Sequence, residues 1–185
     1  MQEHVAMYAG SFDPITCGHL DVVSRSRRLF DRIIVGIGFN PAKAELFPVE
    51  DRTSMATTLI KELVAEEPGA ASVSVERYSG LTVDFARKAG ATALIRGIRN
   101  ITDLAIETQL AITNRQVADI ETVFVVTGEA YAFTSSSLIR QIAALGGDVE
   151  RLEGIIPPLV IERLKLLQEE PSGLLRAMAN DANME

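Results

Sequence analysis

A run of ten residues near the N-terminus, GSFDPITCGH from Gly10 to His19, has the residue types of a phosphate-binding site. Its glycines permit a close approach of the backbone to a ligand, and Pro14 stiffens the turn. His19 falls in the first turn of an expected helix, where free amides and the helix dipole favour an anion. A lone histidine is more often structural, but this one follows a glycine-flanked turn and Thr16. We therefore predict that Thr16 and His19 act on a phosphate group.

A second candidate phosphate site is a run of hydroxyl side chains at the start of a later helix. The run consists of Thr134, Ser135, Ser136 and Ser137. Capping a helix requires one serine, whereas consecutive hydroxyls and free amides fit a triphosphate better, with capping alone as the alternative. Arg140 follows one turn later and either reaches the phosphates or lies on the helix surface.

Basic side chains follow two other expected strands. Lys43 ends the run NPAK, and Arg96 and Arg99 belong to the run RGIR. Guanidinium groups bind phosphate through paired hydrogen bonds. The alternatives are an exposed lysine and salt bridges from the arginines to Asp103 or Glu107. Because ligands of parallel sheets lie at the carboxyl ends of the strands, we favour an anionic ligand for all three basic residues.

Short apolar runs alternate with segments of helical spacing, which predicts an α/β fold with a single doubly wound, Rossmann-like parallel sheet flanked by helices. The expected strands are residues 4–9, 33–38, 72–78, 92–96 and 122–127. Helices are expected where Leu20, Val23 and Phe30 recur, where Met55, Leu59 and Leu63 recur, and over residues 101–118, 135–145 and 157–167. The helix over 101–118 places Ile101, Leu104, Thr108 and Ala111 on one face, as a helix with one buried stripe would.

Composition excludes several classes of protein. The 185 residues are 47% hydrophobic and 23% charged, which favours one globular domain. A net charge of −7 argues against a nucleic-acid partner. No uncharged run reaches the roughly 18 residues of a membrane span, and no signal pattern opens the chain, so a cytoplasmic location is expected. The single Cys17 and two histidines nearly exclude a structural zinc site.

Taken together, the motifs resemble one enzyme family. GSFDPITCGH is similar to the TxGH form of the HxGH motif of the nucleotidyltransferase superfamily, and SSSLIR is similar to its second signature. With NPAK, LIRGIR and GGDV added, residues 5–167 resemble the bacterial phosphopantetheine adenylyltransferases. One departure is Leu104, Ala105 and Ile106, where that family often carries an aromatic residue and a further acid. Residues 1–167 would form the nucleotidyltransferase domain, and residues 168–185 a tail that is either a short helix or mobile.

The resemblance implies reversible transfer of the adenylyl group of ATP to 4′-phosphopantetheine, giving dephospho-coenzyme A and pyrophosphate in coenzyme A biosynthesis. By this resemblance the catalytic residues are Thr16, His19 and Lys43. ATP would contact Ser11, Phe12, His19, Gly97, Ile98, Arg99, Glu107, Tyr131, Ala132, Phe133, Thr134, Ser135, Ser136 and Ser137. Phosphopantetheine would contact Ser11, Lys43, Thr82, Arg96 and Asn114.

The resemblance also implies partners and leaves rival functions open. Mg²⁺ would arrive with ATP, and no metal ligand is assigned, since capping of the turn accounts for Asp13 equally well. A homo-oligomer, a hexamer, is expected. One rival is the same chemistry on nicotinate mononucleotide or on a sugar or polyol phosphate, against which Thr16 and the RGIR arginines argue. The other is a nucleotide sensor without catalysis, which would not need His19 and Lys43.

Overall fold

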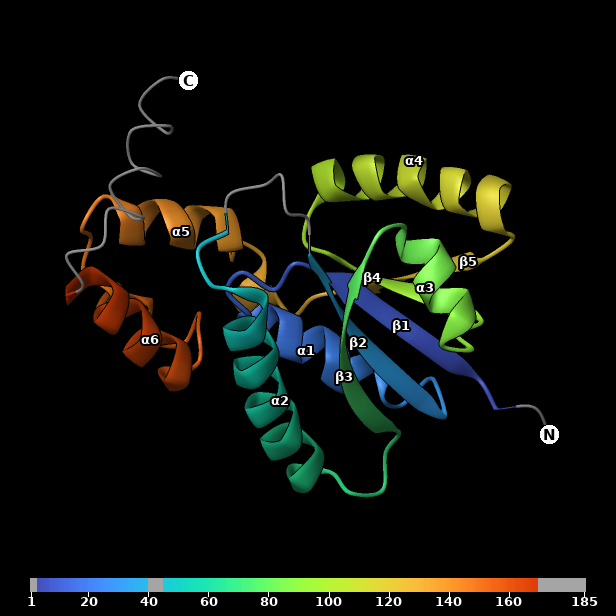
Figure 1. The fold of residues 1–185 in the computed structure, drawn as a ribbon, viewed down its shortest axis with the longest axis horizontal. Coiled ribbons are helices and arrows are strands. Elements are labelled where there is room, and N and C mark those ends of the chain that lie inside the picture. The colour runs from blue at the N-terminus through green and yellow to red at the C-terminus, as the bar shows by residue number, and fades with distance from the viewer. Residues whose placement is uncertain (1–2, 40–44, 170–185) are drawn as a thin grey trace.

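The computed structural model describes residues 3–39 and 45–169 and contains a five-stranded parallel sheet in the order β3-β2-β1-β4-β5 (Figure 1). The strands are β1 Val5–Gly10, β2 Arg32–Phe39, β3 Ser72–Ser79, β4 Ala93–Ile98 and β5 Glu121–Val126. Each lies within two residues of its predicted bounds. The predicted doubly wound α/β fold is confirmed.

Within the described residues, six α-helices connect and follow the strands. They are α1 Cys17–Ser26, α2 Val49–Glu66, α3 Thr82–Lys88, α4 Ile101–Ala118, α5 Ser136–Ala144 and α6 Pro158–Glu169, with short 3₁₀ helices η1 Glu129–Tyr131 and η2 Val149–Leu152. The sequence analysis did not predict α3, because a helix of seven residues with two buried positions is too short to show a periodic apolar stripe. It also extended the first helix to Phe30, four residues beyond its end at Ser26.

The helices cover the two faces of the sheet in pairs. Alternate residues of β1 point to opposite faces: Ala6 and Tyr8 pack with α1 and α2, whereas Val5, Met7 and Ala9 pack with α3 and the end of α4. Both faces are apolar, as expected for a parallel sheet covered on both sides. The sheet thus forms the rigid support for the loops at its carboxyl edge.

The strand order reverses between β1 and β4. From β1 the chain builds β2 and β3 on one side and then crosses to build β4 and β5 on the other. Ala6 pairs with Ala93, so the carboxyl ends of β1 and β4 lie side by side. Ligands of open α/β sheets bind at this switch point. The GSFDPITCGH and RGIR motifs meet there.

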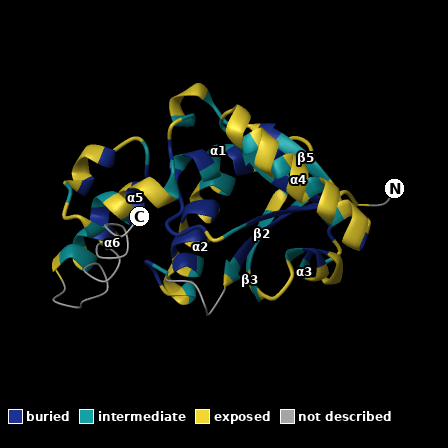
Figure 2. Cartoon of the chain, turned by 90° about the horizontal axis from the view of Figure 1, so that it is seen from above, coloured by how far each residue is buried: buried dark blue, intermediate teal, exposed yellow. Residues whose placement is uncertain are grey.

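The bounds of α4 were predicted, but the predicted buried face was wrong. Ile101 is 85% exposed and Leu104 42% exposed, and of the predicted face only Ala111 is partly buried. Figure 2 shows most of the helix as exposed. The inward positions are instead Asp103, Glu107, Ala111, Asn114 and Ala118. The polar members face inward because they pair with the arginines of the RGIR run or line cavities.

Helices α5 and α6 lie beside the sheet, next to the N-terminal end of α1 (Figure 1). Their buried residues Ile139, Val160 and Leu164 join the α1 side of the core, and the Cys17 amide donates to the Ile155 carbonyl at 3.0 Å. No described helix is long and apolar enough to cross a membrane. Lys43 and residues 170–185 lie outside the described residues, so the predicted role of Lys43 and the tail remain predictions.

Candidate active site

A cavity of about 350 Å³ opens at the switch point between β1 and β4. It gathers eleven of the residues predicted to contact ATP: Ser11, Phe12, His19, Gly97, Arg99, Glu107, Tyr131, Thr134, Ser135, Ser136 and Ser137. Three others do not line it: Ile98 is buried in the sheet, Phe133 is 94% exposed, and Ala132 lies between Tyr131 and Phe133. We call this space the nucleotide cavity.

Thr16 and His19 form a reciprocal cap at the start of α1. The Thr16 hydroxyl accepts from the His19 amide at 3.3 Å, and His19 Nδ1 accepts from the Thr16 amide at 3.0 Å. Such a capping box satisfies two amides that a helix start would otherwise leave unpaired. Because Nδ1 acts as an acceptor, the ring proton belongs on Nε2. The cap therefore orients the imidazole as a hydrogen-bond donor on the wall of the nucleotide cavity.

The His19 ring is neutral in this setting. Burial among Tyr8 and Phe12, followed by the charges of Arg99 and Arg96, lowers the pKa of His19 to about 4. An unfolded chain would take up a proton near pH 6.5, whereas the folded chain would not until about pH 4. His19 therefore makes the fold lose stability as pH falls through that window.

We predict that the His19 ring shows no titration midpoint between pH 5.5 and 8. The chain has two histidines, so a His4→Gln variant leaves His19 as the sole imidazole signal. NMR of its ring protons and nitrogens would report both the pKa and the proton on Nε2. A midpoint near 6.5, or a proton on Nδ1, would contradict the capped neutral ring.

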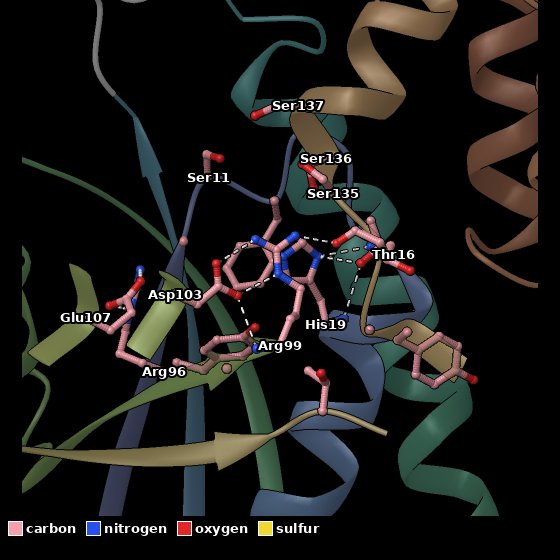
Figure 3. Close-up of a pocket in the computed structure, with 18 of the residues that line it drawn as sticks. Ser11, Thr16, His19, Arg96, Arg99, Asp103, Glu107, Ser135, Ser136 and Ser137 are labelled. Atoms are coloured by element: carbon pink, nitrogen blue, oxygen red, sulfur yellow. Dashed lines mark hydrogen bonds and ion pairs between the residues drawn. The ribbon is translucent and has the colours of Figure 1, made fainter. Parts of the chain in front are cut away.

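Arg96 is held in an ion pair at the end of β4. Its Nε lies 2.6 Å from Glu107 Oε2 and its Nη2 lies 2.5 Å from Glu107 Oε1, while Nη1 donates to the Ala9 carbonyl at 2.6 Å. The second arginine pairs in the same way: Arg99 Nε and Nη2 lie 2.8 and 3.0 Å from Asp103, and Nη1 donates to the Thr134 carbonyl (Figure 3).

The salt-bridge alternative for these arginines is thus present in the structure. Hydrogen bonds to Arg99 hold the pKa of Asp103 below its usual range, so both members of that pair are charged. The pairs fix the guanidinium planes at the cavity wall, where both arginines line the nucleotide cavity. Their predicted contacts with phosphate remain predictions, and any phosphate would join an arginine already oriented by an acid.

The hydroxyls of the serine run cap helix α5 and connect it to the GSFDPITCGH loop. Ser135 caps α5, accepting from the Leu138 amide at 3.5 Å, and Ser136 donates to the Pro14 carbonyl at 2.9 Å. Arg140 does not simply lie on the helix surface. Its Nη1 donates to the Asp13 carbonyl at 2.6 Å, and its Nη2 donates to Ser137 Oγ at 3.0 Å. These contacts fasten the start of α5 to the GSFDPITCGH loop.

Two further cavities adjoin the first on the side of β2, β3 and α4. One of about 370 Å³ is lined by residues including Ser11, Tyr78, Thr82 and Arg96, and one of about 130 Å³ is lined by Thr82, Arg96 and Asn114 among others. Together they gather the four described residues predicted to contact phosphopantetheine, Ser11, Thr82, Arg96 and Asn114, and they add Tyr78, which was not predicted. We call this pair of spaces the acceptor cavities, and Arg96 borders them and the nucleotide cavity alike.

The buried Arg52 is a site-supporting residue that sequence reasoning missed. Its Nη1 donates to the carbonyls of Ser11 and Gly38 at 2.7 and 3.1 Å, and its Nε donates to the Phe47 carbonyl at 2.9 Å. Its Nη2 lies 2.6 Å from Glu45 Oε1. Arg52 thereby connects the end of β2, the segment before α2 and the GSFDPITCGH loop, and no local pattern could have revealed partners so far apart in the chain.

Asp13 caps a segment other than its own turn. Its carboxylate accepts from the amides of Leu46 and Phe47 at 2.8 and 2.9 Å. Burial raises the pKa of Asp13, although these two amides and Arg52 oppose the shift. Among residues 3–39 and 45–169, no three His, Cys, Asp or Glu side chains gather where they could hold a metal ion.

The chain is similar to known proteins over most of its length. The family profile described as cytidylyltransferase-like matches residues 7–142. A phosphopantetheine adenylyltransferase of Moorella thermoacetica is 45% identical over 163 residues, which cover 88% of this chain and 95% of that protein. A protein of the same name from Rhodopirellula baltica is 42% identical over 173 residues, which cover 93% of each chain.

Solved structures share the fold at low sequence identity. The bifunctional NMN adenylyltransferase/ADP ribose pyrophosphatase of Francisella tularensis matches with a TM-score of 0.62 at 15% identity, covering 99% of this chain and 54% of that one. The nicotinic acid mononucleotide adenylyltransferase of Plasmodium falciparum matches with a TM-score of 0.52 at 18% identity, covering 91% of this chain and 97% of that one. Identities this low support only a shared fold, so the inference about the acceptor substrate depends on the sequence relatives.

Proposed function

The chain belongs to the phosphopantetheine adenylyltransferase family of cytidylyltransferase-like nucleotidyltransferases, and we propose how its cavities carry out that family's reaction. The enzyme transfers the adenylyl group of ATP to 4′-phosphopantetheine and releases pyrophosphate, a step of coenzyme A biosynthesis. The observation that carries the proposal is the adjacency of the nucleotide and acceptor cavities, which share Ser11 and Arg96 at their boundary.

The reaction requires alignment and charge stabilisation rather than a nucleophile from the protein. The attacking atom is an oxygen of the acceptor phosphate, which is already ionised at neutral pH. The site must therefore place two polyanions in line and stabilise the charge that builds on the α-phosphate. ATP in the nucleotide cavity and phosphopantetheine in the acceptor cavities would meet at Ser11 and Arg96.

Each cavity group has a part in that alignment. His19 donates its Nε2 proton to the α-phosphate, and its low pKa keeps it a neutral donor that Thr16 holds in place. The amides at the start of α5, with Ser136 and Ser137, face the triphosphate, since a helix N-terminus favours anions. Lys43 would lie between the α-phosphate and the attacking phosphate, as the family resemblance implies.

We propose that Mg²⁺ enters as the complex with ATP rather than as an ion held by the protein. The two acids that line the nucleotide cavity, Asp103 and Glu107, both bind arginine with their carboxylates. The described residues therefore fit a metal carried on triphosphate oxygens better than a dedicated protein site. The cytoplasmic location expected from the sequence also remains a prediction.

A homo-oligomer is the state that the outer surface of α4 supports. Ile101, Ile106, Ile112 and Val117 are each more than half exposed. A helix that is apolar on its outer sides is normally covered, and clustered exposed apolar side chains mark interaction surfaces. The hexamer implied by the family resemblance would bury this surface between copies of the chain.

We predict that an Ile112→Glu variant has a smaller assembled mass than the native chain, because a charge would be buried at the interface. The control is Thr58→Glu, which adds the same charge at an exposed polar position of α2, on the other face of the sheet. Light scattering coupled to size-exclusion chromatography gives the mass. A native chain with the mass of one copy, or equal masses for the native chain and Ile112→Glu, would contradict the proposed interface.

The proposed reaction is tested by following pyrophosphate release from ATP, Mg²⁺ and 4′-phosphopantetheine, with nicotinate mononucleotide as a parallel acceptor. We expect release with phosphopantetheine alone. Release with only the other acceptor would retain adenylyl transfer and overturn the assignment of the acceptor cavities. Binding of ATP without release from either acceptor would support the nucleotide sensor.

A further inference from the structure

One wall of the nucleotide cavity is a segment that consists mainly of loop residues and one short 3₁₀ helix. Residues 127–137 run from the end of β5 through η1 to the first turn of α5, and we call this segment the cavity wall. Six of its side chains line the cavity: Thr127, Tyr131, Thr134, Ser135, Ser136 and Ser137. The position of the cavity wall therefore sets the width of the space that ATP must occupy.

The second half of the cavity wall has several anchors. Arg99 donates to the Thr134 carbonyl, and Ser136 donates to the Pro14 carbonyl at 2.9 Å. Arg140, just beyond the wall, binds the Asp13 carbonyl at 2.6 Å. These contacts join the second half to β4 and to the GSFDPITCGH loop.

The first half begins at Thr127, whose amide and hydroxyl donate to the Ile98 carbonyl at the end of β4 at 3.0 and 3.3 Å. The next residue, Gly128, is anchored by Asp21 of α1. Asp21 Oδ2 accepts from the Gly128 amide at 2.7 Å, across 107 residues of sequence. Gly128 caps the start of η1, and its carbonyl accepts from the Tyr131 amide at 2.9 Å. The hydrogen bond between Gly128 and Asp21 therefore also helps to position Tyr131, which lines the cavity. Asp21 is 18% exposed and also binds Arg25, whose Nε lies 3.0 and 2.9 Å from its two oxygens.

The contact between α1 and η1 is close. A Cβ at Gly18 would lie 3.3 Å from the Tyr131 Cβ, so the start of α1 and η1 touch with little slack. Asp21 lies two residues after His19 on the same helix. The helix that presents His19 to the nucleotide thus also holds the cavity wall through Asp21.

We propose that Asp21 is a positioning residue for the nucleotide: through the Gly128 amide it fixes the cavity wall at the distance from His19 that ATP requires. Asp21 does not line the cavity and touches no substrate. Its loss would leave a partly buried amide without its charged acceptor, and η1 would shift. We expect this shift to weaken ATP binding and to leave phosphopantetheine binding unchanged, because no residue that lines the acceptor cavities forms a hydrogen bond with the Asp21 side chain. This inference rests on the proposed function, since it names ATP as the ligand.

The test compares three variants by steady-state kinetics and by calorimetric titration with ATP alone. In Asp21→Ala we expect the KM and Kd for ATP to rise about 5- to 30-fold, the net loss of one charge-assisted hydrogen bond, with the KM for phosphopantetheine unchanged. Asp21→Asn keeps a carbonyl oxygen for the Gly128 amide and should restore most of the affinity. Arg25→Ala removes the ion pair but leaves the anchor, and should resemble the native chain.

Each result decides a separate question. Equal ATP affinity in Asp21→Ala and the native chain would overturn the positioning role, as would equal weakening in Arg25→Ala. A matching rise in the KM of both substrates would show general loosening of the fold and would overturn it too. Failure of the native chain to release pyrophosphate would overturn the proposed reaction. The Kd values for ATP from calorimetry would still test the positioning role of Asp21.

Discussion

Replacing His19 by alanine should lower kcat about 10²- to 10³-fold while the chain remains folded, because one preorganised donor to the developing charge is removed. The donor is the Nε2 proton of a ring whose Nδ1 is fixed by the Thr16 amide at 3.0 Å. Since the ring is already neutral and oriented before ATP binds, no reorganisation is needed as the α-phosphate gains charge. Single-turnover measurements of pyrophosphate release would isolate this step from product release.

The loss must be separated from the loss of the cap, which His19 shares with Thr16. An Asn side chain can place its oxygen near the position of Nδ1 and accept from the Thr16 amide, but it does not reach the position of Nε2. We expect His19→Asn to recover the stability that His19→Ala loses with the cap, about 1 kcal/mol, without recovering kcat. If His19→Asn turns over at close to the native rate, or His19→Ala stays within tenfold of it, His19 acts through the helix cap alone.

Local sequence predicted the strands and the start of the first helix. The β-branched runs predicted all five strands, and His19 was placed in the first turn of the helix, but the capping box that it forms with Thr16 was not predicted. The order of strand and loop along the chain then placed RGIR next to GSFDPITCGH, because parallel strands end at one edge. Most of the nucleotide cavity could therefore be predicted.

Features that depend on distant partners could not be predicted. Hydropathy placed the apolar residues of α4 inward, yet Asp103 and Glu107 face inward because the arginines of the RGIR run meet them there, in the salt bridges that the sequence had left open as one of two alternatives. Arg52 is a charged residue at a helix start and would ordinarily be exposed, but carbonyls of Ser11, Gly38 and Phe47 converge on it. Burial of a charge is decided by such convergence, which the pattern of neighbouring residues does not contain.

Replacing Arg96 by alanine should weaken phosphopantetheine binding and slow turnover together, lowering kcat/KM for the acceptor about 10²-fold or more, as expected when one partner of a desolvated, hydrogen-bonded charge pair is lost. Burial alone would lower the pKa of Arg96, but the hydrogen bonds that Arg96 donates to the Glu107 carboxylate raise it overall, so the guanidinium is charged where the nucleotide and acceptor cavities meet. In the proposed reaction, a cation there would bind the acceptor phosphate as it attacks. Initial rates over a range of both substrates would give the separate KM values, and a change confined to ATP would contradict the acceptor assignment.

The same substitution also removes the partner of Glu107, so a structural effect must be subtracted. The Glu107 side chain is 14% exposed and that of Arg96 is 30% exposed, which places the cost of the broken pair below the roughly 3–5 kcal/mol of a fully buried one. The double variant Arg96→Ala/Glu107→Gln leaves no unpaired charge at this position, and we expect it to regain thermal stability but not affinity for the acceptor. Recovery of both would mean that Arg96 serves only to neutralise Glu107. Recovery of stability alone would show that Arg96 has two separate roles, holding α4 against β4 in the free protein and presenting a fixed cation to the acceptor.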